Sequence, residues 1–432
     1  MSSAFLTSEP SMPSHLRVFL RSFGPGLLWA GTAIGISHLV QSTRGGADAG
    51  LGLAGVILFA LILKYPFFAF GPLYAAATGE SLVEGYLRIG RWAVWLYFAV
   101  ILSTAVFTHA AIVLFTSYLL LFALGSTASI PMVAAIIYLG FISLLWFGRF
   151  KALDAAIKIV VLLLALSTLL AVVVVLPRVR FETLNLLPLA PVGSGVSLAF
   201  VLALAGWMPS DIAISGFSSL WTLAKDEETG ARAGVSTVRF DFQVAYLATG
   251  VLAFAFLILG AAVMYESGEA FSGSGAVFST QLIDVYVRTL GSWARPVITL
   301  TALTAMLSTT LAIIDGYPRV IDRLTKAVRS GDPEVTAGSP VSGPYWASMV
   351  GIGCLTVIFL WLFAGSLTQM VDFVTTVAFL TGPVLGYLNL RVMTSPQVPA
   401  EHRPGPWMRA LARAGVVVLA LVALAFLAGL AF

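Results

Sequence analysis

Two short polar stretches interrupt otherwise apolar segments of the chain, and they hold the residues best suited to bind a solute. The first lies within residues 31–44 and the second within 206–211. Together they offer an imidazole, a carboxylate, a thioether and small hydroxyl groups. Such a set could bind a metal ion, hold a proton or form hydrogen bonds to a small organic molecule. The candidate substrate-binding residues are Gly35, Ser37, His38, Trp207, Met208, Ser210, Asp211 and, from a later polar stretch, Gln369.

Three titratable residues are candidates for proton coupling. His38 and Asp211 lie in the two polar stretches, and His109 lies in an apolar segment. Histidine titrates near physiological pH, and an ionisable group inside a membrane is a functional candidate by default. We expect all three to take part in proton movement. A core histidine bonded to a neighbouring helix is an equally good interpretation of His109.

The composition predicts that these residues lie within a membrane. Of 432 residues, 59% are hydrophobic and only 10% are charged, whereas soluble domains have about 25% charged residues. The net charge of +4 then indicates basic cytoplasmic loops rather than nucleic-acid binding. The lone Cys354 excludes a disulfide framework and a cysteine metal site. The expected partners are the lipid bilayer and a small transported substrate, and the sequence does not indicate an oligomeric state.

Apolar runs of about 20 residues predict an all-α protein with eleven membrane spans in one domain, residues 1–432. An excess of Lys and Arg on one side places the N-terminus in the cytoplasm and, with an odd number of spans, the C-terminus outside the plasma membrane. The predicted spans are 24–43, 50–77, 92–122, 130–148, 153–176, 196–219, 241–265, 293–316, 344–364, 367–391 and 408–430.

The two polar stretches fall in the first and sixth spans, which are in matching positions of two five-span halves. Interrupted helices in matching positions are typical of transporters built as inverted repeats, with the substrate site near the midplane. We therefore expect a first repeat at 24–176, a second at 196–391 and an extra helix at 408–430. The alternative interpretation is that Gly and Pro merely kink these helices.

Other function classes have weaker support. The sequence has neither a G-x-x-x-x-G-K phosphate loop nor an H-E-x-x-H helix, so we expect no enzymatic activity and no cofactor. An ion channel is a live alternative, because broken helices can also form a polar pore. No repeated ring-forming motif supports that alternative.

Several motifs resemble the NRAMP family of proton-coupled divalent-metal transporters. The resemblance covers most of the chain and rests on Gly24–Gly26 opening the first span, Phe150–Asp154 entering the fifth, the Met208–Pro209 pair in the sixth, and Leu367–Val371 in the tenth. It implies a LeuT-type fold, alternating access and a transported divalent cation with protons as the coupling ion.

The sequence departs from the family pattern at the residues that bind the metal and move protons in the family. The family's first-span motif is Asp-Pro-Gly-Asn, and in this register Gly35 stands at the acidic metal ligand and His38 at the Asn. The family's sixth-span Met-Pro-His-Asn here reads Met-Pro-Ser-Asp, with Ser210 in place of the His. The acidic and polar residues that the family carries in its third span for proton movement have no evident match.

Two substrates are compatible with these departures. A rebuilt metal site of His38, Met208 and Asp211, helped by Gln369, would suit a late first-row divalent ion. Alternatively, a single carboxylate compensates a double charge poorly, and a roomier pocket would suit a small organic solute. The resemblance makes a divalent metal the first expectation, and the local chemistry supports the organic solute.

Overall fold

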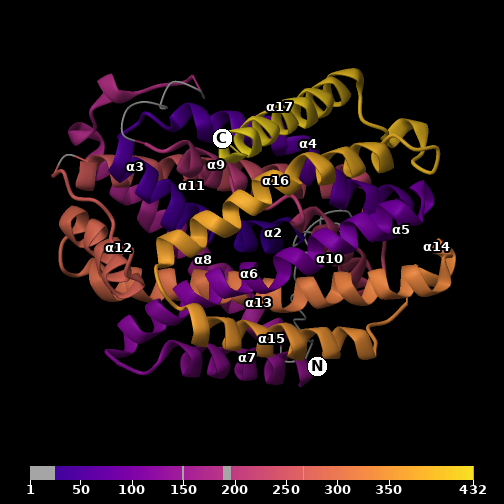
Figure 1. Ribbon diagram of the computed structural model, residues 1–432, viewed down its shortest axis with the longest axis horizontal. Coiled ribbons are helices and arrows are strands. Elements are labelled where there is room, and N and C mark those ends of the chain that lie inside the picture. Colours follow the sequence, from indigo (N-terminus) through magenta and orange to yellow (C-terminus); the bar gives the residue numbers. More distant parts are fainter. Residues whose placement is uncertain (1–24, 148–149, 188–195, 266, 338, 432) are drawn as a thin grey trace, which may run out of the picture.

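A computed structural model describes residues 25–147, 150–187, 196–265, 267–337 and 339–431. Within these ranges the chain forms a bundle of helices (Figure 1). Seven of the described helices are long and apolar enough to cross a membrane. They are α4 (Ala54–Thr78), α6 (Arg91–Leu124), α11 (Val235–Gly260) with its π-helical end η4 (Ala261–Tyr265), α13 (Ala294–Ser330), α15 (Gly343–Phe363), α16 (Leu367–Met393) and α17 (Pro406–Ala431).

Two further helices and two interrupted helices account for the remaining predicted spans. The two further helices are α7 (Ile130–Trp146) and α8 (Phe150–Val175). The first span consists of α2 (Pro25–Ala33), the π-helix η1 (Ser37–Ser42) and α3 (Thr43–Ala49), and the sixth consists of α9 (Leu198–Gly206) and α10 (Ile214–Thr229). Each of the eleven predicted spans thus coincides with a helix or a broken helix. The prediction of an all-α polytopic membrane protein is confirmed.

The connections contain more helix than the sequence predicted. α13 continues to Ser330, whereas the predicted span ends at 316. Its last turns have a polar face and extend beyond the apolar part of the helix. Short helices also lie between spans. They are α5 (Leu82–Ile89), α12 (Gly275–Leu290), α14 (Pro333–Thr336), and the 3₁₀ turns η2 (Leu176–Arg178), η3 (Phe181–Thr183) and η5 (Ala400–His402).

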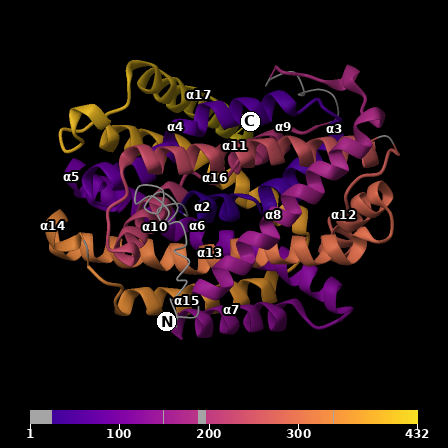
Figure 2. The ribbon, with the colours of Figure 1, turned by 180° about the vertical axis from the view of Figure 1, so that it is seen from behind.

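Helix packing follows the two five-span halves. α2 of the first span packs on α11, the seventh, and α10 of the sixth span packs on α4, the second. These two contacts are equivalent when the halves are exchanged. The third span of each half, α6 and α13, pack against each other, and both views of the ribbon show them side by side (Figures 1 and 2). This packing agrees with the inverted repeat expected from the sequence, in which the first and sixth helices are broken.

Glycine allows both broken helices to approach their neighbours closely. A Cβ at Gly46 in α3 would lie 2.0 Å from the carbonyl oxygen of Leu257 in α11. A Cβ at Gly206, the last residue of α9, would lie 1.9 Å from the carbonyl oxygen of Thr375 in α16. Such contacts are typical of membrane helices, where small residues let backbones pack together. They hold one half of each broken helix against an unbroken one.

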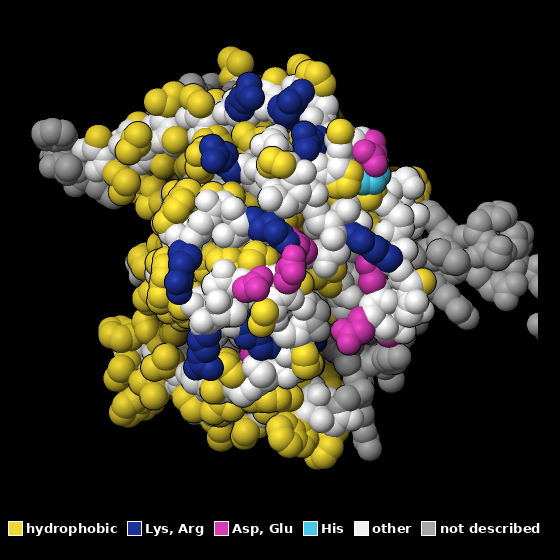
Figure 3. All heavy atoms as spheres, turned by 90° about the vertical axis from the view of Figure 1, so that its right-hand side faces the viewer, with side chains coloured by type: hydrophobic (Ala, Val, Ile, Leu, Met, Phe, Trp, Pro, Cys, Tyr) yellow, Lys and Arg dark blue, Asp and Glu magenta, His cyan; other side chains and the backbone are white. Residues whose placement is uncertain are grey.

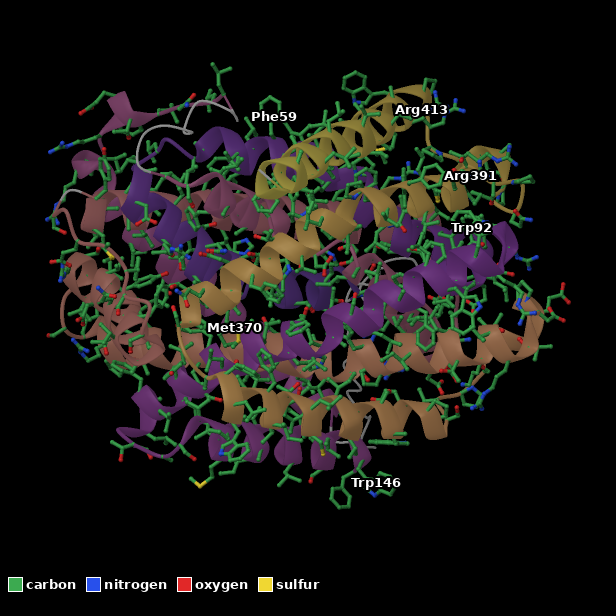
Figure 4. All side chains as sticks on the ribbon, in the orientation of Figure 1. Phe59, Trp92, Trp146, Met370, Arg391 and Arg413 are labelled. Carbon is green, nitrogen blue, oxygen red and sulfur yellow. The ribbon has the colours of Figure 1, made fainter. Side chains whose placement is uncertain are left out.

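The surface separates into an apolar belt and a basic end. Phe59 and Trp146 point outward from opposite sides of the bundle, where lipid would surround them (Figure 4). Arg391 and Arg413 lie toward one end of the molecule, and Lys and Arg side chains gather on the face seen from that end (Figure 3). This gathering is what a cytoplasmic face requires. The orientation of the termini stays a prediction.

Candidate functional site

A closed cavity of about 20 Å³ lies between the broken sixth helix, α2, α6 and α13. This is room for about one water molecule. Eight of the twelve lining residues have a polar side-chain atom, although most of the exposed wall is apolar. The lining residues are Thr32, Ala33, Ser37, Thr108, Ile112, Trp207, Ser210, Asp211, Ile214, Thr309, Ile313 and Tyr317. Of the predicted binding residues, Ser37, Trp207, Ser210 and Asp211 therefore share one site.

The break in the sixth helix directs two unpaired polar groups at this site. α9 ends at Gly206 and α10 begins at Ile214, and Pro209 between them has no N–H to continue a helix. Asp211 uses Oδ1 to accept a hydrogen bond from the Ala213 N–H at 3.0 Å, which caps the start of α10. Within the described part of the chain, Asp211 Oδ2 and Trp207 Nε1 are buried and have no hydrogen-bond partner. A guest could pair with both.

The sixth-helix break is also held by a buried lysine. Lys64 of α4 is 2% exposed, and its Nζ donates to the carbonyl oxygens of Gly206 and Ser210, both at 2.8 Å, and of Ala205 at 3.2 Å. The sequence analysis did not include Lys64 in the site. Its burial among apolar residues was the available signal, because an ammonium at that depth needs partners.

His38 does not line the cavity. Its side chain is buried in the packing between the first span and α11. Its Nε2 lies 2.9 Å from the carbonyl oxygen of Thr249 in α11, and its Nδ1 lies 2.8 Å from Ser37 Oγ. Both ring nitrogens are engaged, and the ring is fully buried. Ser37 Oγ also lies 2.7 Å from the Ala33 carbonyl oxygen and 3.1 Å from the Pro209 carbonyl oxygen, and its single hydroxyl hydrogen can be donated to one of these neighbours at a time. His38 thus positions Ser37, and Ser37 joins the two breaks.

Three other predicted residues do not line the cavity. Gly35 packs against Thr309, whose Oγ1 would be 2.8 Å from an added Cβ. The Met208 side chain is fully buried elsewhere. Gln369 is exposed on the first turn of α16, because that helix begins only at Leu367. The expected set of His38, Met208, Asp211 and Gln369 is therefore not assembled around one point.

His109 lies one layer behind the cavity. Its Nδ1 is 2.7 Å from the Ala105 carbonyl oxygen one turn earlier in α6. Its ring meets the ring of Tyr317, a lining residue, at 5.0 Å in an edge-on contact. Tyr317 donates to Thr108 Oγ1 at 3.2 Å. The histidine therefore lies behind the cavity wall, in contact with Tyr317.

No metal centre forms in the described ranges of the chain: no group of three His, Cys, Asp or Glu side chains there could share an ion. Among the described residues that line the cavity, Asp211 is the only carboxylate. The Lys64 ammonium lies near enough to attract it electrostatically. The site therefore combines one negative and one positive side chain, with hydroxyl groups around them.

Two groups of polar contacts link helices that surround the cavity. In one group, Arg44 of α3 forms two hydrogen bonds of 2.8 Å to the carboxylate of Asp372 in α16, beside a surface cleft of about 560 Å³. The Gln41 amide donates to the same carboxylate at 3.1 Å. In the other group, Asp315 of α13 accepts hydrogen bonds from Arg319, Tyr345 and Trp221 at 2.7, 2.7 and 3.3 Å.

Solved structures with the same fold include several transporters. The chain aligns with a mutant of the Eremococcus coleocola manganese transporter at a TM-score of 0.67 and 15% identity, covering 96% of this chain and 88% of the other. It aligns with Mhp1, a nucleobase-cation-symport-1 family transporter, at 0.55 and 15%, covering 93% and 91%. The match to MhsT in complex with L-phenylalanine has a TM-score of 0.61 and 13% identity, covering 95% and 97%. At these identities the likeness establishes the fold.

A relative in sequence covers nearly the whole chain. No model of a protein family matches the sequence. The Pasteurella multocida protein PM0681, described as uncharacterized, is 32% identical over 415 residues, which are 94% of this chain and 92% of that protein. The chain belongs to the same family as PM0681.

Proposed function

We propose that the protein is a secondary active transporter that carries a small solute across the plasma membrane by alternating access. The observation that carries the proposal is the pair of unpaired groups, Asp211 Oδ2 and Trp207 Nε1, in one closed cavity at the broken sixth helix. Buried polar groups without partners are rare in folded proteins, and a substrate would satisfy both. The LeuT-type fold and the polar contacts that link the helices around the cavity support the same proposal.

The substrate that best fits the site is a small organic solute with an amine or other cationic donor group. That group would pair with Asp211, while an acceptor on the same solute would take the Trp207 N–H. The hydroxyl groups of Thr32, Ser37 and Thr309 would add weaker contacts. The cavity must widen to admit such a solute, as it does when a carrier opens to either side.

A divalent metal is the second candidate, in line with the NRAMP resemblance. The small cavity supports it, because the space suits a single ion better than a molecule. The charge balance opposes it, because one carboxylate offsets a double charge poorly and the Lys64 ammonium is close by. A metal would also need His38 and Met208 to turn into the cavity.

Protons are the coupling ion that we propose, with Asp211 as the main proton-accepting group. Asp211 lines the cavity and its Oδ2 has no hydrogen-bond partner among the described residues, so that a proton and a cationic substrate would compete for it. His38 and His109 stand further from the cavity and would act indirectly. The N-terminus is proposed to lie in the cytoplasm and the C-terminus outside.

A ligand screen on the purified protein tests this proposal. Ligands that bind the folded state raise Tm, so we would compare small amines and amino acids with Mn²⁺ and Cd²⁺. We expect at least one organic solute to raise the Tm of the wild type and to have a much weaker effect on Asp211→Asn. Asp284→Asn, a partly exposed control, should respond like the wild type. Stabilisation by Mn²⁺ alone would replace the organic solute with a metal, and single-channel currents in planar bilayers would contradict a carrier.

A further inference from the structure

Lys64 occupies a site that is built from backbone carbonyl groups. Its Nζ lies 2.8, 2.8 and 3.2 Å from the carbonyl oxygens of Gly206, Ser210 and Ala205. Two of these residues are the last of α9, where carbonyl groups lose their partners within the helix. The third, Ser210, lies within the break itself. The ammonium group thus links the end of α9 to the break from a neighbouring helix.

The geometry requires the charged form of the lysine. An ammonium group has three N–H donors and no acceptor, which matches three carbonyl acceptors. A neutral amine has only two N–H groups, and its lone pair would then face a carbonyl oxygen. The carboxyl end of α9 also carries the negative end of the helix dipole, which favours a cation. The Lys64 stem passes Phe68, with Nζ 5.6 Å from the ring centre, and the side chain is almost fully buried.

A ring of carbonyl oxygens at a broken helix is the kind of site in which carriers coordinate a cation such as Na⁺. We propose that Lys64 is a tethered cation that takes the place of a bound inorganic cation in the carbonyl site formed by Ala205, Gly206 and Ser210. The positive charge that compensates these carbonyl groups and Asp211 is then part of the protein. Folding of the sixth-helix break needs no Na⁺.

The consequence for coupling rests on the proposed transport function. A cation that is covalently attached cannot cross the membrane with the substrate. A Na⁺ gradient therefore has no ion to act on at this site, and the driving ion must bind elsewhere, with Asp211 as the neighbouring group that can take a proton. The carbonyl site itself does not depend on transport and can be tested without a substrate.

The test measures Tm of the purified full chain in buffers that differ only in their cation. The probes are NaCl, n-propylammonium chloride, which replaces the atoms deleted by Lys64→Ala, and choline chloride, which is too bulky for the site. We expect the wild type to have the same Tm in all three. We expect Lys64→Ala to unfold several degrees lower in choline, and n-propylammonium or Na⁺ to restore part of the loss. Lys225→Ala, at a partly exposed lysine, should show neither effect.

Two results would overturn the proposal. One is a wild-type Tm that rises with Na⁺ over choline, because the site would then bind an inorganic cation despite Lys64. The other is a folded Lys64→Ala variant whose Tm is the same in all three salts. If Lys64→Ala cannot be purified, Lys64→Gln keeps the length of the side chain without its charge. Na⁺ is then expected to stabilise Lys64→Gln, and indifference to Na⁺ would count against the tethered cation. The ligand screen above can fail independently of these results.

Discussion

The two broken helices differ, at the break itself, in how completely their own polar groups are satisfied. In the described structure the first broken helix also has buried polar atoms without a partner, Trp29 Nε1 and Gln41 Oε1, but these lie away from its bend. At the bend of the first, the Gly35 carbonyl accepts hydrogen bonds from the N–H groups of both His38 and Leu39, and both ring nitrogens of His38 have partners. At the break of the sixth, Asp211 Oδ2 and Trp207 Nε1 have none in the described structure. The first break is a bend stabilised by its own contacts, and the second is open to a guest.

This difference teaches that a glycine-rich interruption of an apolar helix does not by itself identify a binding site. The same sequence signature serves packing in the first helix, whereas in the sixth it lies beside the proposed substrate site. What separates them is the group of a neighbouring helix that meets the break. The backbone carbonyl of Thr249 in α11 supplies an acceptor to His38, whereas Lys64 of α4 donates to carbonyl groups of the sixth helix, and Asp211 Oδ2 is left without a hydrogen-bond partner in the described structure.

The largest expected effect on stability comes from Gly206→Ala. Its Cβ would lie 1.9 Å from a backbone oxygen of α16 that cannot move alone, so the packing of α9 must shift, at about 3 kcal/mol or more. Gly35→Ala in the first break meets a Thr309 side chain at 2.8 Å that can rotate, and should destabilise by ~1 kcal/mol. Thermal unfolding of the two variants compares the breaks directly. Equal losses would contradict the rigid contact at Gly206.

His38→Ala should destabilise the protein by about 1–3 kcal/mol, because it leaves the buried Thr249 carbonyl unpaired and removes a partner of Ser37. His38→Gln, which retains an amide donor, should recover part of the loss. The free energy of unfolding from denaturant titration provides the measurement. A His38→Ala variant as stable as the wild type would remove the packing role that separates the two breaks.

The smallest effect is expected for Asp372→Asn, at the ion pair that links α3 to α16. Arg44 and Asp372 are both partly exposed, and such pairs contribute at most about 1 kcal/mol. The loss should shrink in 1 M NaCl, because salt screens the pair in the wild type. Tm at low and high salt checks this. A loss as large as that of Gly206→Ala would mean that this ion pair, rather than helix packing, holds the outer half of the first helix.

The spans and both breaks were predictable from sequence, because hydropathy and interruptions by glycine and proline are local signals. The cavity was predictable only in part. Ser37, Trp207, Ser210 and Asp211 line it as expected, but residue type does not tell which way a side chain points, and His38 and Met208 point elsewhere. Gln369 was misplaced because it lies on the first turn of a span whose start was predicted correctly, and a residue there is at the exposed end of the helix rather than near its middle.

The cavity wall opposite the broken helices is formed by residues that are far away in the sequence. Thr108 of α6, together with Thr309 and Tyr317 of α13, reaches the cavity through helix packing, which no local pattern encodes. Lys64 was visible in the sequence as a buried charge, but its partners are backbone oxygens of another span. A search of the sequence for charged or acidic partners of Lys64 could not find these backbone oxygens.

The most direct test of the central claim compares binding to Asp211→Asn and His38→Gln. The probe is the small amine that most raises the Tm of the wild type, and its affinity is measured by calorimetry on the purified protein. Losing a hydrogen bond to a charged group weakens binding by about 1.5–3 kcal/mol, or roughly 10- to 100-fold. We predict this loss for Asp211→Asn and an affinity within about threefold of the wild type for His38→Gln. Unchanged binding to Asp211→Asn, or an equal loss in both variants, would contradict a substrate site at the sixth-helix break.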